Sequence, residues 1–261
     1  MLYSRSVIVI TLQSGSNGNS IYVESGRTKL LFDAGISGVR AEQRLAGFGR
    51  DIRDVQGGFI SHEHADHISS AGVYQRKYGL PLYVTHQTLA VASKWRGIGR
   101  LTDLRHFSTG QMIRCGELSV ETIRTPHDGI DSVAFVVEGS GRRLGILTDL
   151  GHVFLELPRI VASLDAVLIE SNYDPDLLES GPYPAYLKQR IQGCGGHLSN
   201  IEAAKLLREA GGPQLSWVCL SHLSEQNNTP ELALKTHADH LPAWVRLLAA
   251  SRHEATMMPE L

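Results

Sequence analysis

The amino-acid sequence predicts an α/β protein in which two facing β-sheets are covered by helices on their outer sides. Two groups of short segments are rich in β-branched and aromatic residues and are bounded by turn residues, as strands are. Helical segments separate the strands of both groups, an arrangement that suits two packed sheets with outer helices. No repeat, low-complexity tract or linker interrupts the sequence, so we expect one domain over residues 1–261.

Each element is expected where the apolar pattern and the turn residues agree. The strands are expected at residues 7–12, 21–24, 29–32, 55–60, 80–84, 118–124, 133–138, 144–147, 165–170 and 218–220. The helices are expected at residues 39–45, 69–77, 86–95, 201–209, 230 to about 240, and 244–250. Pro230 suits the first position of its helix, and Pro242 separates the last two helices.

The composition is that of an ordinary soluble globular protein, with 42% hydrophobic and 20% charged residues. A net charge of -2 gives no global positive field, so a polyanion would have to be bound by metals and a local patch. Three cysteines without a C-x-x-C pair suit a reducing compartment. The apolar run within residues 1–10 is too short for a signal sequence, and no apolar stretch approaches about 20 residues. We therefore expect a cytoplasmic protein without a membrane segment.

Metal-binding side chains are concentrated directly after the strand expected at residues 55–60. Within seven residues the chain has three imidazoles and two carboxylates, and four of these form the pattern His62, His64, Asp66 and His67. Imidazole nitrogen and carboxylate oxygen are the usual ligands of zinc and similar divalent ions. The two pairs, His62 with His64 and Asp66 with His67, predict two metal ions.

This H-x-H-x-D-H order resembles the signature of the metallo-β-lactamase fold superfamily. Members of this superfamily use a four-layer αββα sandwich to hold one or two metals at a sheet edge. The resemblance implies that His127, behind a proline turn, completes a three-imidazole set with His62 and His64. It also implies that Asp33, after the strand at residues 29–32, supports the metal loop.

The same resemblance places Asp149, at the end of an apolar strand, between the two metals as a bridge. His222, after the strand at residues 218–220, would join Asp66 and His67 on the second metal. The β-lactamase branch has a cysteine at the position of Asp149, so the aspartate argues against β-lactam chemistry. The implied cofactors are two divalent ions, zinc first, with manganese or iron as alternatives because the same ligands suit all three.

Glu170 and His197 indicate which branch of the superfamily the sequence resembles. The nucleic-acid-processing branch, which includes RNase Z and the RNase J nucleases, has an acid and a histidine in these places. The resemblance implies that His197 reaches the scissile phosphate, that Glu170 orients it, and that Asp66 aims the attacking water. The alternative is that Glu170 is a capping or surface carboxylate and His197 a helix flank.

Two further segments allow a structural or a functional interpretation. The turn at residues 14–20 is either a flexible hairpin turn or a nest that contacts a substrate anion through Ser16, Asn17 and Asn19. The basic segment at residues 94–105 is either a solvated loop or a binding site for a nucleic acid strand. In the second case its cations would contact the phosphates and a base would stack on Trp95. The turn and residues 221–231 resemble the YycJ/WalJ-like group of the superfamily.

That group resemblance implies a dinuclear metal-dependent phosphodiesterase, a 5'-to-3' exonuclease that attacks DNA with a hydroxide held between the metals. The expected partner is DNA or another phosphodiester, with no membrane. The chain has no room for the large clamp domain of RNase J-like enzymes. Two alternatives stay open: a hydrolase of a small cyclic phosphodiester, thioester or lactone, and a regulatory metalloprotein without turnover.

Overall fold

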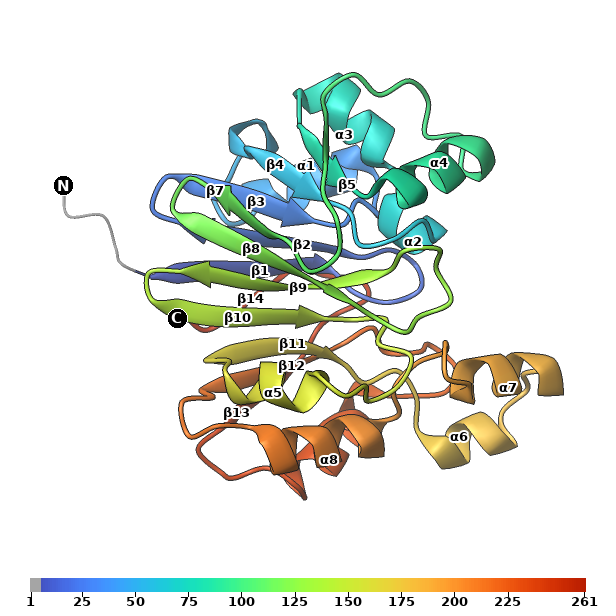
Figure 1. The fold of residues 1–261 in the computed structure, drawn as a ribbon. Coiled ribbons are helices and arrows are strands. Elements are labelled where there is room, and N and C mark those ends of the chain that lie inside the picture. Colours follow the sequence, from blue (N-terminus) through green and yellow to red (C-terminus); the bar gives the residue numbers. More distant parts are fainter. Residues whose placement is uncertain (1–5) are drawn as a thin grey trace.

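The computed structural model describes residues 6–261 and arranges them as two seven-stranded sheets with helices on both outer sides (Figure 1). This is the αββα sandwich that the sequence predicts, so the predicted fold class is confirmed. Residues 1–5, part of the stretch considered for a signal sequence, lie outside the described residues. No helix within residues 6–261 is long and apolar enough to cross a membrane. The assignment of residues 1–261 to one domain stays a prediction.

The strands of the first sheet, in sheet order, are β14 (Thr256–Met257), β1 (Val7–Gln13), β2 (Ser20–Ser25), β3 (Thr28–Phe32), β4 (Gly57–Phe59), β5 (Leu82–Val84) and β6 (Leu104–His106). Pairing is antiparallel from β14 to β3 and parallel from β3 to β6.

The strands of the second sheet, in sheet order, are β13 (Arg246–Ala249), β12 (Trp217–Ser221), β11 (Ala166–Glu170), β10 (Arg142–Leu147), β9 (Val133–Gly139), β8 (Leu118–Arg124) and β7 (Met112–Cys115). Pairing is antiparallel from β7 to β10 and parallel from β10 to β13. Because β9 is antiparallel to both of its neighbours, β8, β10, β11 and β12 all run in the same direction.

The helices follow the chain from one outer side of the sandwich to the other. They are α1 (Gly38–Ala46), the 3-10 turn η1 (Ile52–Asp54), α2 (Ala65–Ile68), α3 (Ala71–Tyr78), α4 (His86–Trp95), α5 (Leu157–Ala162), α6 (Pro175–Ser180), α7 (Ala185–Gln192), α8 (Asn200–Ala210) and α9 (Pro230–Ala238). Figure 1 shows α1, α3 and α4 beside the first sheet, α5 and α8 beside the second, and α6 and α7 projecting at one end.

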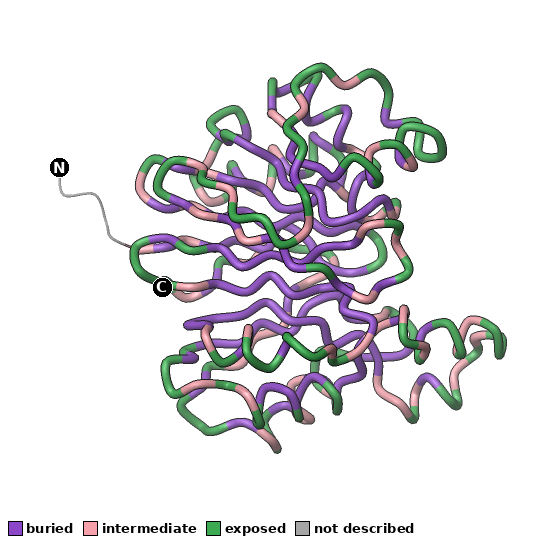
Figure 2. The backbone as a smooth tube through the Cα atoms, viewed as in Figure 1, coloured by how far each residue is buried: buried purple, intermediate pink, exposed green. Residues whose placement is uncertain are grey.

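Apolar side chains fill the space between the sheets and under the helices. In the central layer Phe32 stacks with Phe59 at 5.4 Å and packs against Phe135 at 5.2 Å between ring centroids. Separate cores lie under the helices of each sheet, one around Tyr74 and the other around Leu207. Figure 2 shows that the strands of both sheets are largely buried while the loops and outer helix faces are exposed. The sheets are therefore a rigid base for side chains at their edges.

Most expected strands and helices are present, with small differences in their bounds. The helix expected at residues 69–77 begins at Ala71, and residues 65–68 form the separate short helix α2. The helix expected at residues 244–250 is wrong, because Arg246–Ala249 is the strand β13, which pairs with β12 and completes the second sheet. Pairing with a neighbouring strand outweighs the helical pattern of this short segment.

At one edge of the sandwich, polar side chains follow the carboxyl ends of β3, β4, β8, β10, β11 and β12. Three of the residues at this edge, Asp33, Asp149 and His222, have positive φ angles of 64°, 56° and 56°. Non-glycine residues rarely adopt this conformation, and it is concentrated at functional sites. These backbone conformations therefore indicate that the functional site lies at this edge.

Candidate metal centre

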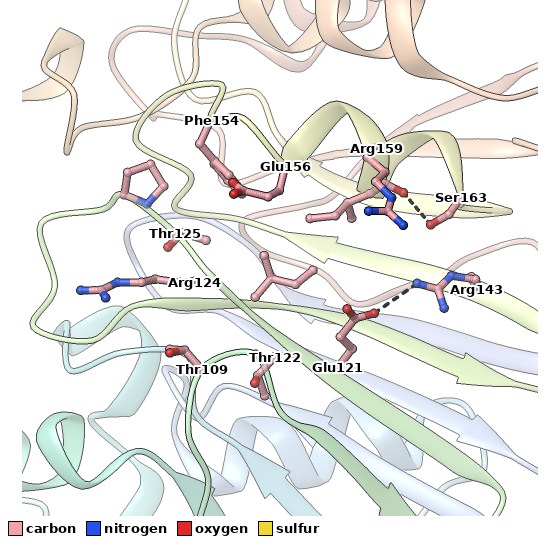
Figure 3. A pocket seen from close by; sticks show the side chains of 14 residues that line it. Thr109, Glu121, Thr122, Arg124, Thr125, Arg143, Phe154, Glu156, Arg159 and Ser163 are labelled. Atoms are coloured by element: carbon pink, nitrogen blue, oxygen red, sulfur yellow. Dashed lines mark hydrogen bonds and ion pairs between the residues drawn. The ribbon is translucent and has the colours of Figure 1, made fainter.

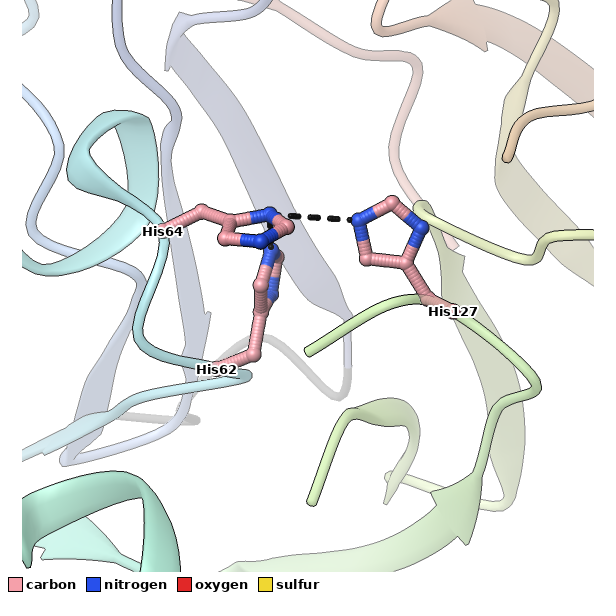
Figure 4. Close-up of side chains that lie close together, drawn as sticks. All are labelled: His62, His64 and His127. Carbon is pink, nitrogen blue, oxygen red and sulfur yellow. Dashed lines mark hydrogen bonds between the residues drawn. The ribbon is translucent and has the colours of Figure 1, made fainter. Parts of the chain in front are cut away.

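Three imidazoles meet at the sheet edge, as the sequence predicts (Figure 4). His62 and His64 follow β4, and His127 reaches them from the loop after β8 in the opposite sheet. His64 Nδ1 lies 3.0 Å from His62 Nε2 and 3.2 Å from His127 Nε2. Three imidazole nitrogens that face one another cannot all be satisfied by hydrogen bonds among themselves. A cation bound between them would accept the lone pair of each nitrogen.

A second group of ligand atoms lies beside the first. Asp66 and His67 belong to the helix α2, and His222 follows β12. Asp66 Oδ2 lies 3.3 Å from both His67 Nε2 and His222 Nε2. These three residues could hold a second ion, so the structure brings together the two ligand sets that the sequence predicts.

Asp149 lies between the two groups. Its Oδ2 is 3.2 Å from His67 Nε2, and its Oδ1 is 3.6 Å from His127 Nε2. The side chain is buried, and apart from this contact with His67 its Oδ2 has no hydrogen-bond partner among residues 6–261. Burying a carboxylate oxygen with so few partners is costly unless a cation also binds there, so the donor set fits two divalent ions, one on each side of Asp149. The metal roles of these seven side chains stay predictions.

Neighbouring groups fix how the imidazoles point. His67 Nδ1 lies 2.7 Å from Asp33 Oδ2, and Ser61 donates to the same carboxylate through its backbone N at 2.8 Å and its Oγ at 3.0 Å. His127 Nδ1 donates to the Gly196 carbonyl at 2.9 Å. A proton held on Nδ1 leaves Nε2 free as a metal ligand, which is the usual role of such supporting groups.

His197 and Glu170 form a close pair next to the second group. His197 Nδ1 lies 2.6 Å from Glu170 Oε1, and Glu170 Oε2 accepts from the backbone N of Leu150 and Leu198, each at 3.1 Å. Glu170 is fully buried, whereas His197 is partly exposed. The contact that the resemblance implies is therefore present, and the partly exposed His197 ring can meet a substrate. Their catalytic roles stay predictions.

Opposite charges compensate one another among the side chains of the site. Burial alone would raise the pKa of Asp149, but His222 and His67 lower it well below its ordinary value. Burial would lower the pKa of His222, but Asp149, Asp66 and Glu170 raise it to about 10. Burial, with a smaller effect from His67, holds the pKa of His62 well below its ordinary value. Metal binding would displace the protons that these carboxylates retain on the imidazoles, so the affinity should fall in acid.

The three residues predicted to bind substrate lie in different surroundings. Asn19 is buried, and its Nδ2 donates to Asp66 Oδ2 at 3.2 Å, so it contacts a predicted metal ligand. Ser16 and Asn17 are exposed, and Asn17 Nδ2 donates to the Arg252 carbonyl at 3.2 Å. Substrate contact by these residues stays a prediction.

Several side chains at the site were not identified from the sequence. Asp128 Oδ1 lies 3.4 Å from His64 Nε2, and Asp128 Oδ2 accepts from Arg190 Nε at 2.7 Å. Asn172 donates to the His222 carbonyl at 2.8 Å, and Ser14 Oγ accepts from the His222 backbone N at 2.8 Å. Asp128 lies four residues after the end of β8, and Asn172 lies two residues after the end of β11. This position after a strand is the feature of the sequence that could have indicated both residues.

A cleft of about 830 Å³ lies away from this cluster. It is formed by β8, β10 and the region around α5, and Figure 3 shows Arg124, Arg143 and Arg159 among its side chains. None of the seven predicted ligands lines it. Six other histidines belong to no metal-binding group among residues 6–261: His86, His106, His152, His237, His240 and His253. The predicted metal site therefore lies at the sheet edge and not in the cleft.

Comparison with known proteins agrees with this geometry. The profile of the beta-lactamase superfamily domain matches residues 28–222. Exodeoxyribonuclease WalJ of Streptococcus pneumoniae is 37% identical over 232 residues, which cover 88% of this chain and 86% of WalJ. Exodeoxyribonuclease YycJ of Bacillus anthracis is 35% identical over 228 residues, covering 85% and 84% of the two chains.

The fold is also similar to that of solved structures. The metallo-beta-lactamase fold protein YhfI of Bacillus subtilis superposes with a TM-score of 0.73 at 16% identity, covering 97% of this chain and 100% of YhfI. The profile match includes every predicted metal ligand, and the WalJ and YycJ similarity spans most of both chains. The chain therefore belongs to the beta-lactamase superfamily, in the group with the metallo-β-lactamase fold that includes WalJ and YycJ.

Proposed function

We propose that this chain is a dinuclear metal-dependent phosphodiesterase that removes nucleotides from the 5' end of DNA. The observation that carries the proposal is the convergence of the seven predicted ligand side chains with the His197–Glu170 pair at one sheet edge. The relatives named exodeoxyribonucleases support a DNA substrate. The imidazole-rich donor set favours zinc, with manganese or iron as alternatives. A DNA substrate also supports the cytoplasmic location predicted from the sequence.

Bound divalent ions would supply a water of lowered pKa and would neutralise a nonbridging oxygen of the phosphate. Asp66 would accept a hydrogen bond from the attacking water and aim it at phosphorus. Asn19 and His222, at 3.2 Å and 3.3 Å from Asp66 Oδ2, hold that carboxylate in place. The water oxygen forms the new bond to phosphorus as the bond to the 3'-oxygen of the departing nucleotide breaks.

His197 would serve the leaving side of the phosphate. Because Glu170 Oε1 holds its Nδ1, the Nε2 atom is the ring nitrogen left for the substrate. Nε2 would donate a hydrogen bond to the developing negative charge and then a proton to the leaving 3'-oxygen. The buried carboxylate of Glu170 stabilises the positive ring that this step requires.

Nucleotide release from 5'-phosphorylated DNA tests the proposal. Metal-stripped protein with zinc or manganese added back should release mononucleotides from the 5' end, and blocking that end should stop the release. Asp149→Ala should lose the activity, whereas Asp54→Ala, which removes a surface carboxylate paired with Lys29, should retain it. Cleavage of bis(p-nitrophenyl) phosphate without any cleavage of DNA would instead favour a small phosphodiester substrate. Absence of both activities would refute the proposal.

A further inference from the structure

The C-terminal end of α4 presents an exposed aromatic ring between two cations. Trp95 is 69% exposed, although tryptophan usually buries most of its surface. Its neighbours Lys94 and Arg96 are also exposed. A single exposed aromatic ring is common on protein surfaces, so only its position on the molecule can indicate a role.

This end of α4 is bonded directly to the loop that contains the metal ligands. Arg96 Nε donates to the carbonyl of Glu63, the residue between His62 and His64, at 2.9 Å. The Glu63 carboxylate in turn accepts from the backbone N of Ile130 at 3.0 Å. The Trp95 segment and the loop of Ile130 therefore both adjoin the metal loop, and Figure 1 shows α4 close to α2.

The segment that follows Trp95 is anchored to the fold. Ile98 is only 2% exposed and packs in the core under the first sheet's helices. Arg76 Nη1 donates to the carbonyls of Ile98 at 3.0 Å and Arg100 at 3.2 Å. The backbone is therefore held on both sides of Trp95, which keeps this residue close to the loop of His62 and His64.

The charges around the ring suit a phosphate backbone. Lys94 Nζ lies 4.9 Å from the centroid of the Trp95 ring, and most of the Trp95 side chain is exposed to solvent. The Arg100 guanidinium has no partner among residues 6–261. The acid within this segment, Asp103, lies 3.8 Å from Arg105 Nε and is partly neutralised by it. Lys94, Arg96 and Arg100 thus leave a local excess of positive charge despite the net charge of -2.

We propose that Trp95, with Lys94 and Arg96, is a platform for the single-stranded end of a DNA substrate. This inference rests on the proposed function and adds the residues that distinguish a single-stranded end from a duplex. An unpaired base offers a face on which the indole can stack, while the cations contact the flanking phosphates. Bases within a duplex do not offer that face, so the platform selects single-stranded ends.

Binding to a 3'-fluorescein-labelled, 5'-phosphorylated oligothymidylate tests the platform, measured by anisotropy with metal-stripped protein so that no cleavage occurs. Trp95→Ala should weaken binding about tenfold or more, and Trp95→Phe should retain most of it. Trp244→Ala is the matched control, because Trp244 is 68% exposed and precedes β13 at the amino ends of the parallel strands. This control should bind as the wild type does.

A second readout follows the indole itself. In the Trp244→Phe background the oligonucleotide should quench the emission of Trp95, since the third tryptophan, Trp217, is buried. Equal affinity of Trp95→Ala and wild type, or equal weakening by Trp244→Ala, would overturn the platform and leave the proposed function standing. Failure of the wild-type protein both to bind and to cleave DNA would overturn both.

Discussion

Asp33→Asn separates support of the metals from stability of the fold. The carboxylate accepts from Ser61 N, Ser61 Oγ and His67 Nδ1 at 2.8, 3.0 and 2.7 Å. Asparagine has nearly the same shape and tolerates the positive φ of 64° at this position. It retains an oxygen for Ser61 N, but its amide nitrogen cannot accept from Ser61 Oγ or from His67 Nδ1.

The change should act on His67. An amide beside Nδ1 favours the tautomer with the proton on Nε2, which is the atom that faces Asp66 and Asp149. Loss of such a supporting partner costs about 10- to 100-fold in metal affinity, or about 1.4–2.8 kcal/mol. We expect this loss for the second ion, measured by competition with a chromophoric chelator on metal-stripped protein.

Asp165→Asn is the matched control. Asp165 is also buried and accepts from Arg142 Nη1 and Arg143 N, each at 2.8 Å, but it precedes β11 at the opposite edge of the sheet. The Asp165→Asn substitution should lower the free energy of unfolding and leave the metal affinity unchanged. The reasoning would be refuted if Asp33→Asn bound both ions as tightly as the wild type, or if Asp165→Asn weakened metal binding equally.

Three further predictions concern the reaction, acid stability and metal removal. His197→Gln should lower kcat for bis(p-nitrophenyl) phosphate by about 10²- to 10⁴-fold with both ions retained, as measured by kinetics and metal analysis; loss of an ion would make His197 a ligand. Burial lowers the pKa of His237 to about 4, below its unfolded value of 6.5, so its contribution to stability is present above pH 6.5 and is lost as the pH falls toward 4. Urea unfolding of metal-stripped protein at pH 7 and pH 5 should therefore show a loss about 2 kcal/mol larger for the wild type than for His237→Leu, and equal losses would contradict this. Chelation should lower the Tm, because each ion at about 100 times its Kd adds about 2.7 kcal/mol, and an unchanged Tm would count against bound metal.

The candidate ligands could be predicted because the sequence shows both the metal-binding residue types and the strands that precede them. Carboxyl ends of parallel strands meet at one edge, so polar residues after separate strands could be expected to converge. The resemblance then placed His127, Asp149 and His222, which lie far from the first motif in sequence.

Other features depend on contacts that no local pattern encodes. The hydrogen bond from Arg190 to Asp128 joins α7 to the loop that contains His127, across 62 positions of sequence. The strand β13 forms only because β12 is available for pairing, so its four residues were assigned to a helix. The proximity of Trp95 to the loop of His62 and His64 likewise depends on a long-range contact, the hydrogen bond from Arg96 to the Glu63 carbonyl.

The most direct test of the central claim is a crystal structure of the protein soaked in zinc or manganese, with the ions located by anomalous scattering. The account predicts two peaks, one within reach of His62, His64 and His127 and the other within reach of Asp66, His67 and His222. Asp149 should lie between them. A single peak, or ions bound only away from this sheet edge, would contradict the dinuclear site and the reaction derived from it.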